Sequence, residues 1–529
     1  MKNQPYPLYE ISHIRDLKEM LEQKEKQMPA GIAFTYPKGR GQTVEKTYHD
    51  VYCEVNALGT WEFQNGLHGT HIAIISENSY EWLLVYFSIV NGGNVAVPID
   101  KELPREEIVG LLQKAAVTAV FCSKAYMELV ADIKNIIVFP MSEMNDYIGE
   151  GMRYIAEGDT EYLDYEIDRK KMCCIMFTSG TSGVSKGVML SHENIAEDIN
   201  GSCQLFALEG NTIALLPFHH AFGLVVGVFM LFHYGYTIYI NKSLKMLQKA
   251  LQTAKPQTMF LVPLFVETFE RQIWENVKKE GKDKAFRRMM KLSDSLLRLG
   301  IDIRKKCFAS VRKAFGGELQ YIISGGAGIG IKYIQEFRSW GVEILNGYGT
   351  TECSPCAAVN RNYYHKDGTV GLPIPNAKVK VAEDGEVFIQ GPFVMLGYYK
   401  DAEATGKALN DGWYATGDLG VLDKDGFLNL TGRKKNLIIL SNGENVSPEE
   451  LEADILKDEA VQEVLVYEKN GIIVAEIYPW DEYSGNEVYF NNLIKQINHN
   501  RPLYKQIGKV LLRDTEFEKN TSRKIIRYK

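Results

Sequence analysis

The sequence has no apolar run long enough to cross a membrane. Its longest run, Ala221 to Phe232, has twelve residues, whereas a transmembrane helix needs about 20. We therefore expect this run to form a buried helix. The first residues, Met1-Lys-Asn-Gln-Pro-Tyr-Pro, contain no apolar stretch of the kind found in signal peptides, so we expect a cytoplasmic protein.

Cysteine is also scarce, with eight residues in a chain of 529. So few cysteines cannot frame a chain of this length with disulfides, and reduced thiols are expected. Cys353 and Cys356 have the spacing of a redox or metal pair, but no second pair follows them. An ordinary structural role is therefore favoured. The sequence has neither repeats of solenoid length nor low-complexity tracts.

Basic residues are fewer than acidic residues: 60 Lys and Arg stand against 67 Asp and Glu, which gives a net charge of -7. This balance argues against a nucleic-acid partner. The segment from Arg271 to Lys313 is different, because fourteen basic and five acidic residues give it a net charge of +9. We favour an amphipathic helix pair with a solvated basic face; the alternative is contact with an anionic membrane surface. Apolar residues at roughly helical spacing suit either reading: Phe286, Met289, Met290, Leu292, Leu296, Leu297 and Leu299.

Strand and helix patterns alternate along most of the chain, which indicates the α/β class. A buried strand is predicted at 71–75, a helix at 80–90 and a second strand at 94–98. From Gly385 to Gly397 the pattern becomes β-rich, with Gly and Pro between the strands. The last stretch of about a hundred residues has strand and helix signals of its own, so we place a domain boundary at Lys434 to Lys435.

The ten residues from Thr178 to Gly187, Thr-Ser-Gly-Thr-Ser-Gly-Val-Ser-Lys-Gly, are the most informative part of the sequence. Glycines let the backbone approach an anion, hydroxyls add donors, and Lys186 adds a positive charge, so polyphosphate binding is predicted. A Walker loop would place its lysine at the start of a helix. Here a short apolar strand follows instead and Ser191 resembles a helix N-cap, so the loop is expected to close a hairpin-like turn.

A second segment, Asn346 to Glu352, carries further groups suited to ATP. The Tyr348 ring can cover a purine face, Thr351 can donate to the α-phosphate, and Glu352 can ligate Mg²⁺. Alone, the segment could be an ordinary turn. Upstream, Ser324-Gly-Gly-Ala-Gly follows an apolar strand, and its Gly325, Gly326 and Ala327 form a turn against which a flat base can lie.

Candidates at five further positions complete the predicted site. Asp418 suits the paired hydroxyls of a ribose, and Arg433 suits a hydroxyl or phosphate, although each could be a surface ion pair. His219 and His220 precede the apolar run, and we favour His220 for contact with a substrate carboxylate or its tunnel. Near the C-terminus, Lys524 could neutralise charge at the phosphates during attack.

In this order, these segments resemble the adenylate-forming superfamily of acyl-CoA ligases, peptide-synthetase adenylation domains and beetle luciferases. The resemblance covers nearly the whole chain and includes the segment from Ser441 to Glu452. It implies a large N-terminal domain (1–434) of two doubly wound α/β subdomains and a β-barrel subdomain. A small mobile α+β C-terminal domain (435–529) would rotate about Lys435.

The resemblance also implies roles for the motif residues. Tyr348 would contact adenine, Asp418 and Arg433 the ribose, Glu352 a Mg²⁺ ion, and Lys524 would serve adenylation. Rotation about the hinge would then replace Lys524 by the Gly443 region and admit the thiol of coenzyme A. The remaining ligands of ATP and Mg²⁺ would be Thr178, Ser179, Gly180, Thr181 (also on the metal), Ser182, Gly183, Lys186, Gly325, Gly326, Ala327, Gly349, Thr350 and Thr351.

Within the superfamily, the segment from Leu440 to Val446 and the long insertion between Leu261 and Tyr321 resemble long-chain fatty acid-CoA ligases. This predicts activation of a medium- or long-chain fatty acid to an acyl-adenylate, followed by transfer to coenzyme A. Alternatives are transfer to a carrier-protein phosphopantetheine, an aromatic or other carboxylate substrate, or a nucleotide-binding regulator without the chemistry. Chain length, acceptor and oligomeric state stay open.

Overall fold

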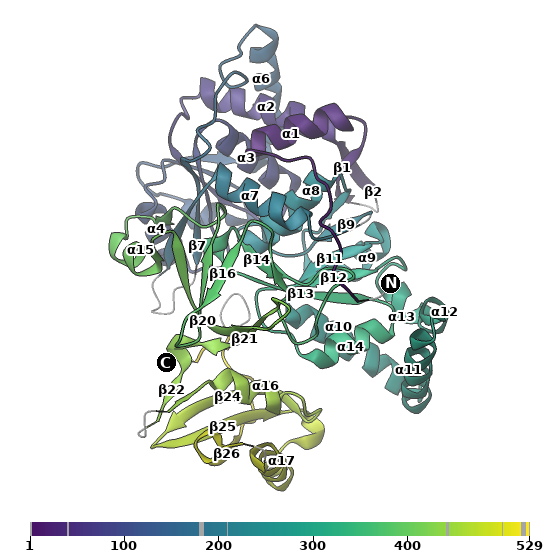
Figure 1. Ribbon diagram of the computed structural model, residues 1–529. Helices are drawn as coiled ribbons and strands as arrows, with labels where there is room; N and C mark the ends of the chain where they lie inside the picture. The colour runs from purple at the N-terminus through teal and green to yellow at the C-terminus, as the bar shows by residue number, and fades with distance from the viewer. Residues whose placement is uncertain are drawn as a thin grey trace.

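The computed structural model describes residues 3–39, 42–178, 185–208, 210–440, 444–499, 501–519 and 525–527. The described strands form two large sheets, a smaller curled antiparallel sheet, a two-stranded sheet and a three-stranded C-terminal sheet (Figure 1). The strands at 71–75 and 95–98 and the helix at 80–91 confirm the alternation expected there. The expected α/β class is confirmed.

The first large sheet has nine strands in the order β15-β14-β13-β12-β11-β9-β10-β1-β2. Its central strands run parallel, whereas β2, β14 and β15 are antiparallel to their neighbours. The bounds are β1 (Ile32–Gly39), β2 (Gln42–Thr47), β9 (Thr212–Ala214), β10 (Ile238–Ile240), β11 (Thr258–Leu261), β12 (Tyr321–Ser324), β13 (Glu343–Gly349), β14 (Cys356–Val359) and β15 (Leu372–Pro373).

The second large sheet has seven strands in the order β18-β8-β7-β4-β3-β5-β6. Parallel strands occupy one side of it, and the antiparallel pairs β7–β8 and β8–β18 occupy the other. The bounds are β3 (His71–Ile75), β4 (Val95–Pro98), β5 (Ala119–Cys122), β6 (Ile137–Pro140), β7 (Met172–Thr178), β8 (Lys186–Ser191) and β18 (Gly397–Tyr398).

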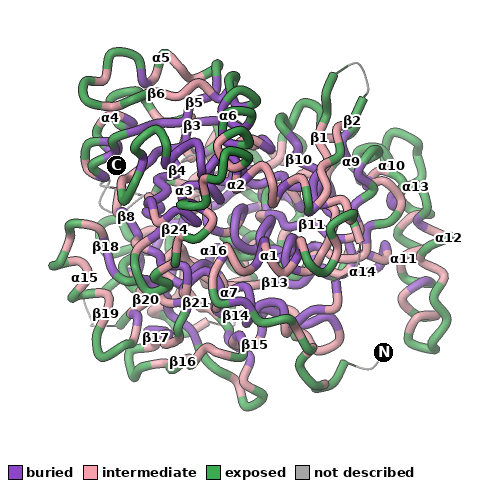
Figure 2. The backbone as a smooth tube through the Cα atoms, turned by 90° about the horizontal axis from the view of Figure 1, so that it is seen from above, coloured by how far each residue is buried: buried purple, intermediate pink, exposed green. Residues whose placement is uncertain are grey.

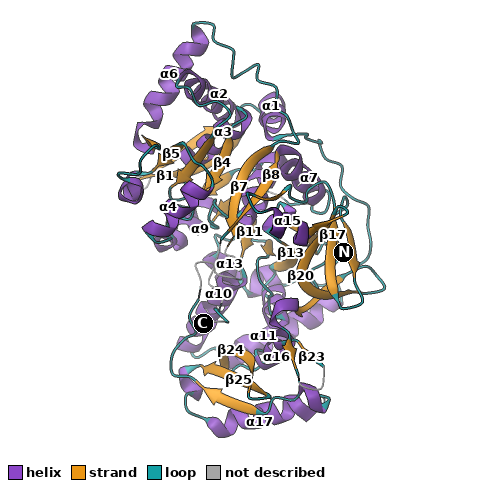
Figure 3. Ribbon diagram, turned by 90° about the vertical axis from the view of Figure 1, so that its left-hand side faces the viewer, coloured by secondary structure: helices purple, strands orange, loops and turns teal. Residues whose placement is uncertain are grey.

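Helices cover both faces of each large sheet, which is the doubly wound arrangement expected (Figure 3). The largest apolar core lies between the sheets and includes α2 (Tyr48–Gln64), α3 (Tyr80–Asn91) and α7 (His192–Cys203). The expected buried helix is here too, as a π-helix at Phe222–Phe229 followed by α8 (Met230–Tyr234). The other helices of the first 254 residues are α1 (Leu17–Gln27), α4 (Arg105–Lys114), α5 (Met127–Val130), α6 (Met144–Ala156) and α9 (Leu247–Ala254).

A third sheet lies in the region where a β-rich pattern was predicted. It is antiparallel, with the order β16-β17-β20-β19 and β21 paired to β20. It is curled, and its described strands form an antiparallel half-barrel where the β-barrel subdomain was expected. Its strands are β16 (Lys378–Val381), β17 (Glu386–Gln390), β19 (Leu409–Asn410), β20 (Trp413–Leu422) and β21 (Leu428–Arg433), and α15 (Ala402–Ala408) lies beside it.

The C-terminal part has an apolar core of its own, drawn from residues 438–507. It lies below the rest of the molecule in Figure 1. Its elements are β22 (Ile438–Ile439), β23 (Asn445–Val446), α16 (Pro448–Ile455), β24 (Val461–Lys469), β25 (Ile472–Pro479), α17 (Glu487–His499) and β26 (Lys509–Leu512).

The basic segment is helical, as expected, but it forms four helices where a pair was predicted. Its helices are α10 (Pro263–Lys279), α11 (Asp283–Arg298), α12 (Arg304–Cys307) and α13 (Ala309–Ala314). Phe286, Met289 and Met290 pack against a core formed with α14 (Ile331–Ser339). Leu292 and Leu299 do not join this core, because their side chains are 56% and 76% exposed. Along α11 the backbone is largely exposed or half-buried (Figure 2).

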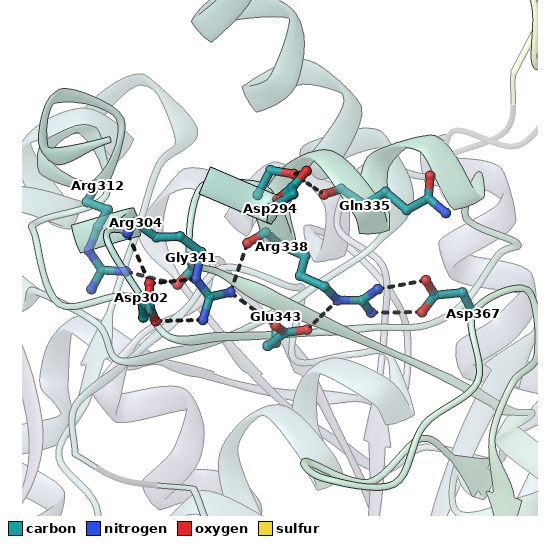
Figure 4. Close-up of polar contacts among 10 residues, drawn as sticks. Asp294, Asp302, Arg304, Arg312, Gln335, Arg338, Gly341, Glu343 and Asp367 are labelled. Atoms are coloured by element: carbon teal, nitrogen blue, oxygen red, sulfur yellow. Dashed lines mark hydrogen bonds and ion pairs between the residues drawn. The ribbon is translucent and has the colours of Figure 1, made fainter. Parts of the chain in front are cut away.

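Two arginines of this segment bind polar groups of the surrounding fold (Figure 4). Arg304 forms two hydrogen bonds to Asp302, at 3.0 and 2.8 Å, and Arg312 donates to the Gly341 carbonyl at 3.0 Å. Arg338 of α14 binds Asp367 through both terminal nitrogens and Glu343 at the start of β13. These contacts fix the amino end of β13, whose other end carries Tyr348.

Other cations of the segment face the C-terminal part. The Arg271 guanidinium lies 5.5 Å from the Trp480 ring centre. Lys278 and Glu482 lie 3.9 Å apart, and Arg287 and Glu459 lie 4.0 Å apart. Exposed pairs of this kind are weak. In the described part of the chain, no helix is both long enough and apolar enough to span a bilayer.

Glu62 provides a stability test of the main core. Its carboxyl group is fully buried and accepts a hydrogen bond of 2.6 Å from the Ser88 hydroxyl. Burial raises the pKa of Glu62 to about 8, so the folded protein keeps a proton that the unfolded chain releases near pH 4.5. The Glu62 contribution to stability is present below pH 4.5 and is lost as the pH rises to 8.

Glu62→Gln should therefore stabilise the protein at pH 8 by roughly 3–5 kcal/mol, because glutamine keeps the acceptor and does not titrate. Melting temperatures of the two proteins should agree near pH 4.5 and separate steadily up to pH 8. A difference that does not change with pH would show that the carboxyl group ionises normally in the folded state.

Candidate active site

Two neighbouring strands deliver the glycine-rich turn and the tyrosine to one edge of the first sheet. Ser324 at the end of β12 is paired with Asn346 in β13, and the strands are parallel. The turn 325–327 therefore lies beside the segment that carries Tyr348. Gly326 has φ +81°, a conformation that favours glycine. At Gly349 an added Cβ atom would come within 1.7 Å of the Pro355 carbonyl oxygen, so a larger residue would clash with the backbone there.

A hydrogen bond and an ion pair join Tyr348, Asp418 and Arg433 in one group. The Tyr348 hydroxyl donates to Asp418 Oδ2 at 2.6 Å, and Arg433 Nε lies 2.8 Å from Asp418 Oδ1. Asp418 and Arg433 are cross-strand neighbours on β20 and β21. Burial raises the pKa of Tyr348 well above its ordinary value, and the Asp418 charge adds to the shift. The fold thus joins three residues that lie in separate motifs.

The hydroxyl-rich segment joins β7 to β8, which are antiparallel, with Thr178 paired to Lys186. This confirms the hairpin-like connection and excludes a Walker arrangement, in which a helix would follow the lysine directly. Ser191 caps α7 as expected, through a capping box with Asn194. Five of the predicted ligands lie outside the described residues: Ser179, Gly180, Thr181, Ser182 and Gly183.

Lys186 and Glu352 meet at a residue that the sequence did not single out, Tyr398. The Lys186 ammonium lies 4.7 Å from the centre of the Tyr398 ring. The Tyr398 hydroxyl donates to Glu352 Oε1 at 2.8 Å. Burial raises the pKa of Tyr398, and the Glu352 charge contributes, so the hydroxyl stays a donor. Thr351 and Glu352 lie in a 3₁₀ turn, Thr351–Cys353, between β13 and β14.

The two histidines differ in their surroundings. His219 is buried, with Nε2 3.6 Å from Asp100. Burial lowers its pKa far below the ordinary value, so this contact is not an ion pair at neutral pH. The His220 ring is 4.3 Å from that of His219 and is less buried. The helix that follows touches the glycine-rich turn, because a Cβ on Gly325 would lie 3.1 Å from the Phe222 ring.

The predicted hinge lies where the third sheet meets the C-terminal part. Lys434 is bound to Glu386 at 2.6 Å and to Asp384 at 2.7 Å. Burial lowers the pKa of Lys435, and the Arg433 charge adds to this. A Cβ on Gly432 would lie 2.2 Å from the Ser447 hydroxyl, so the two parts approach closely here. Lys524 and Gly443 lie outside the described residues.

The Cys353 and Cys356 thiols are free, like the other described cysteines. Burial raises the pKa of both, which keeps them protonated and poorly nucleophilic. Among the described residues there is no group of three or more His, Cys, Asp or Glu side chains that could hold a metal.

Comparison with known proteins decides the family. The AMP-binding enzyme family matches residues 21–399. The chain belongs to this family. The family and the enzyme class expected from the motifs are thereby confirmed: it is an adenylate-forming acid-CoA ligase family enzyme.

Relatives within this family include fatty acid ligases. Long-chain-fatty-acid-CoA ligase FadD15 of Mycobacterium bovis is 28% identical over 426 residues, covering 75% of this chain and 71% of its own. Long-chain-fatty-acid-CoA ligase 5 of Rattus norvegicus is 27% identical, covering 88% and 75%. o-Succinylbenzoate CoA synthetase of Bacillus subtilis, solved with its acyl-adenylate intermediate, has the same fold: its TM-score is 0.74 at 21% identity, with 96% of each chain covered.

Proposed function

We propose that the protein activates a medium- or long-chain fatty acid with ATP and Mg²⁺, releases pyrophosphate, and transfers the acyl group to coenzyme A. One observation carries the proposal. The Tyr348–Asp418–Arg433 group and the Lys186–Tyr398–Glu352 group lie at opposite ends of one short segment, residues 348–352. Groups suited to a nucleoside and groups suited to phosphates and a cation therefore adjoin.

The nucleoside end fits adenosine. The Tyr348 ring offers a flat face beside the 325–327 turn, which can cover a base. Asp418 is nearly fully buried and is held by a hydrogen bond from Tyr348 and an ion pair with Arg433, so its oxygens are fixed where they can accept bonds from ribose hydroxyls. Arg433 is partly exposed and can reach the same ribose. Gly349 and Thr350 join this end to the phosphate end.

The phosphate end fits a polyphosphate with Mg²⁺. Mg²⁺ is commonly bound by one or two carboxylates together with substrate phosphates. Glu352 is a single carboxylate whose Oε1 is fixed by Tyr398, which matches that donor set. Lys186, Thr351 and the segment 178–183 with Thr181 would hold the phosphates. When bound, Mg²⁺ offsets the negative charge of the phosphates.

The reaction we propose has two steps at one site. A carboxylate oxygen attacks the α-phosphorus, and the bond to the β-phosphate oxygen breaks, so pyrophosphate leaves. The thiol then attacks the activated carbonyl, its proton is lost, and AMP leaves with the bridging oxygen. Lys524 would stabilise the first step. Rotation of the domain 435–529 against 1–434 about Lys435 would then bring the Gly443 region to the site.

The fatty acid assignment is supported by the names of the relatives and by the buried π-helix at 222–229. This helix is apolar and touches the glycine-rich turn through Phe222. An acyl chain lying along it would place its carboxylate near His220 and the α-phosphate. An aromatic acid is the second candidate, because a protein with the same fold carries an o-succinylbenzoyl group.

Exchange of labelled pyrophosphate into ATP, driven by a panel of carboxylic acids, tests the assignment. Medium- and long-chain fatty acids should drive exchange best, and Lys524→Ala should lower it by at least a hundredfold while sparing the transfer of a supplied acyl-adenylate to coenzyme A. No exchange with any acid would identify a nucleotide-binding regulator. Best exchange with an aromatic acid would overturn the fatty acid assignment.

The thiol acceptor is identified in two parallel reactions, one with coenzyme A and one with a carrier-protein phosphopantetheine. Mass spectrometry of the products shows which thiol receives the acyl group. Equal loss of both half-reactions in Lys524→Ala would reject the role given to this lysine.

We also propose that the outer face of α11 contacts the anionic surface of a membrane, with the protein cytoplasmic and peripheral. This face, defined as Lys284, Arg288, Lys291, Leu292 and Leu299, combines exposed cations with exposed leucines. In the described part of the chain, no carboxylate lies within ion-pair distance of its three cations. The following turn adds Ile301, which is 52% exposed. Basic charge beside apolar side chains suits an anionic lipid surface.

Vesicles containing phosphatidylserine should retain the protein at 10 mM salt and release it at 150 mM or above, because salt screens the attraction. Arg288→Glu with Lys291→Glu should weaken retention at least about tenfold. Lys495→Glu with Lys509→Glu, a matched charge reversal on the C-terminal part, should not. Equal retention by uncharged phosphatidylcholine vesicles, or equal effects of the two double variants, would remove the proposal.

A further inference from the structure

Two residues on one face of α7 bind the two chain segments that flank the turn carrying Glu352. The residues on this face are Asn194 and Asp198, four positions apart, so they lie one above the other on the helix. Both are buried, and neither belongs to a motif assigned to ATP, metal or acid. Apart from the capping bonds between Asn194 and Ser191, their partners are backbone groups on the two segments that flank the Thr351–Cys353 turn in space.

Asn194 holds the first flank. Its side-chain nitrogen donates to the carbonyls of Pro392 and Val394, at 2.7 and 2.9 Å. The next backbone N–H, that of Met395, donates to the Glu352 carbonyl at 2.9 Å. Tyr398 follows three residues later and binds the Glu352 carboxylate. One amide group therefore fixes the segment that contacts Glu352 at both its backbone and its side chain.

Asp198 holds the second flank. Its Oδ1 accepts a hydrogen bond of 2.8 Å from the backbone N–H of Cys356, the first residue of β14. The chain from Glu352 to Cys356 is thus fixed where it leaves the turn. Burial raises the pKa of Asp198 well above its ordinary value, which favours the neutral form of the carboxyl group. A neutral side chain with an oxygen in this place would serve equally well.

We infer that Asn194 and Asp198 are positioning residues that fix the Glu352 carboxylate for Mg²⁺. The inference rests on the metal role proposed for Glu352. A carboxylate that supplies most of the protein's share of a metal site depends on its supports, because no other described ligand cluster compensates for a small displacement. Both side chains bind backbone groups of the segments beside Glu352, so both act through Glu352.

Asn200 provides a matched control. It lies on the same helix, is equally buried, and also binds backbone groups through its amide: it accepts from the N–H of Ile14 at 3.1 Å and donates to the Ile14 carbonyl at 2.8 Å. Its partner belongs to the N-terminal segment, far from the Glu352 turn in the chain. Asn200→Ala should therefore cost stability without changing the metal requirement.

The test measures the free Mg²⁺ concentration that gives half-maximal pyrophosphate exchange at saturating ATP and acid. Asn194→Ala and Asp198→Ala should each raise it roughly 10–100-fold. Asp198→Asn should restore it to within about twofold of the unmodified protein, and Asn200→Ala should leave it unchanged. Circular dichroism and melting temperature report whether each variant folds. If Asn194→Ala does not fold, the comparison of Asp198→Ala with Asp198→Asn tests the inference.

An unchanged Mg²⁺ requirement in folded Asp198→Ala, or an equal rise in Asn200→Ala, would overturn the inference. Glu352→Gln separates this failure from that of the proposed metal site. If its requirement rises while those of the α7 variants do not, only the positioning role is wrong. If Glu352→Gln has a normal requirement, the metal role of Glu352 is wrong and the inference falls with it.

Discussion

The hydrogen bond from the Tyr398 hydroxyl to the Glu352 carboxylate is the contact on which the site depends, because three distant parts of the chain meet there. Tyr398 lies in β18, which pairs with β8 and so with the strand that begins at Lys186. Glu352 lies in the turn after β13 of the other large sheet. Together with the bond from the Met395 N–H to the Glu352 carbonyl, this contact fixes the β7–β8 hairpin relative to the candidate metal ligand on the other large sheet.

The nucleoside end is built by a different kind of contact. Parallel pairing of β12 with β13 sets the glycine-rich turn beside Tyr348, and the antiparallel pair β20–β21 sets Asp418 beside Arg433. The Tyr348–Asp418 hydrogen bond then ties the first sheet to the third. Burial of Asp418 makes this bond strong, since few waters compete for the carboxylate. The two ends share residues 348–352, so base, ribose and phosphates can be held in a fixed order.

The sequence predicted well what depends on local pattern. The strands around Thr178–Gly187, the cap at Ser191 and the buried helix after His220 follow from residues close together in the chain. Tyr398, Asn194 and Asp198 could not be found in that way, because their roles depend on contacts across 46 to 200 residues that no local spacing encodes. The exposure of Leu292 and Leu299 likewise depends on tertiary packing.

The central claim is that a carboxylate oxygen attacks the α-phosphorus of ATP held between Tyr348 and Glu352. A fatty acid labelled with ¹⁸O in its carboxylate tests this directly when the products are weighed after one turnover with coenzyme A. The account predicts one ¹⁸O atom in AMP and none in pyrophosphate. Formation of ADP, or label in inorganic phosphate or pyrophosphate, would contradict it, because attack would then occur at another phosphorus atom.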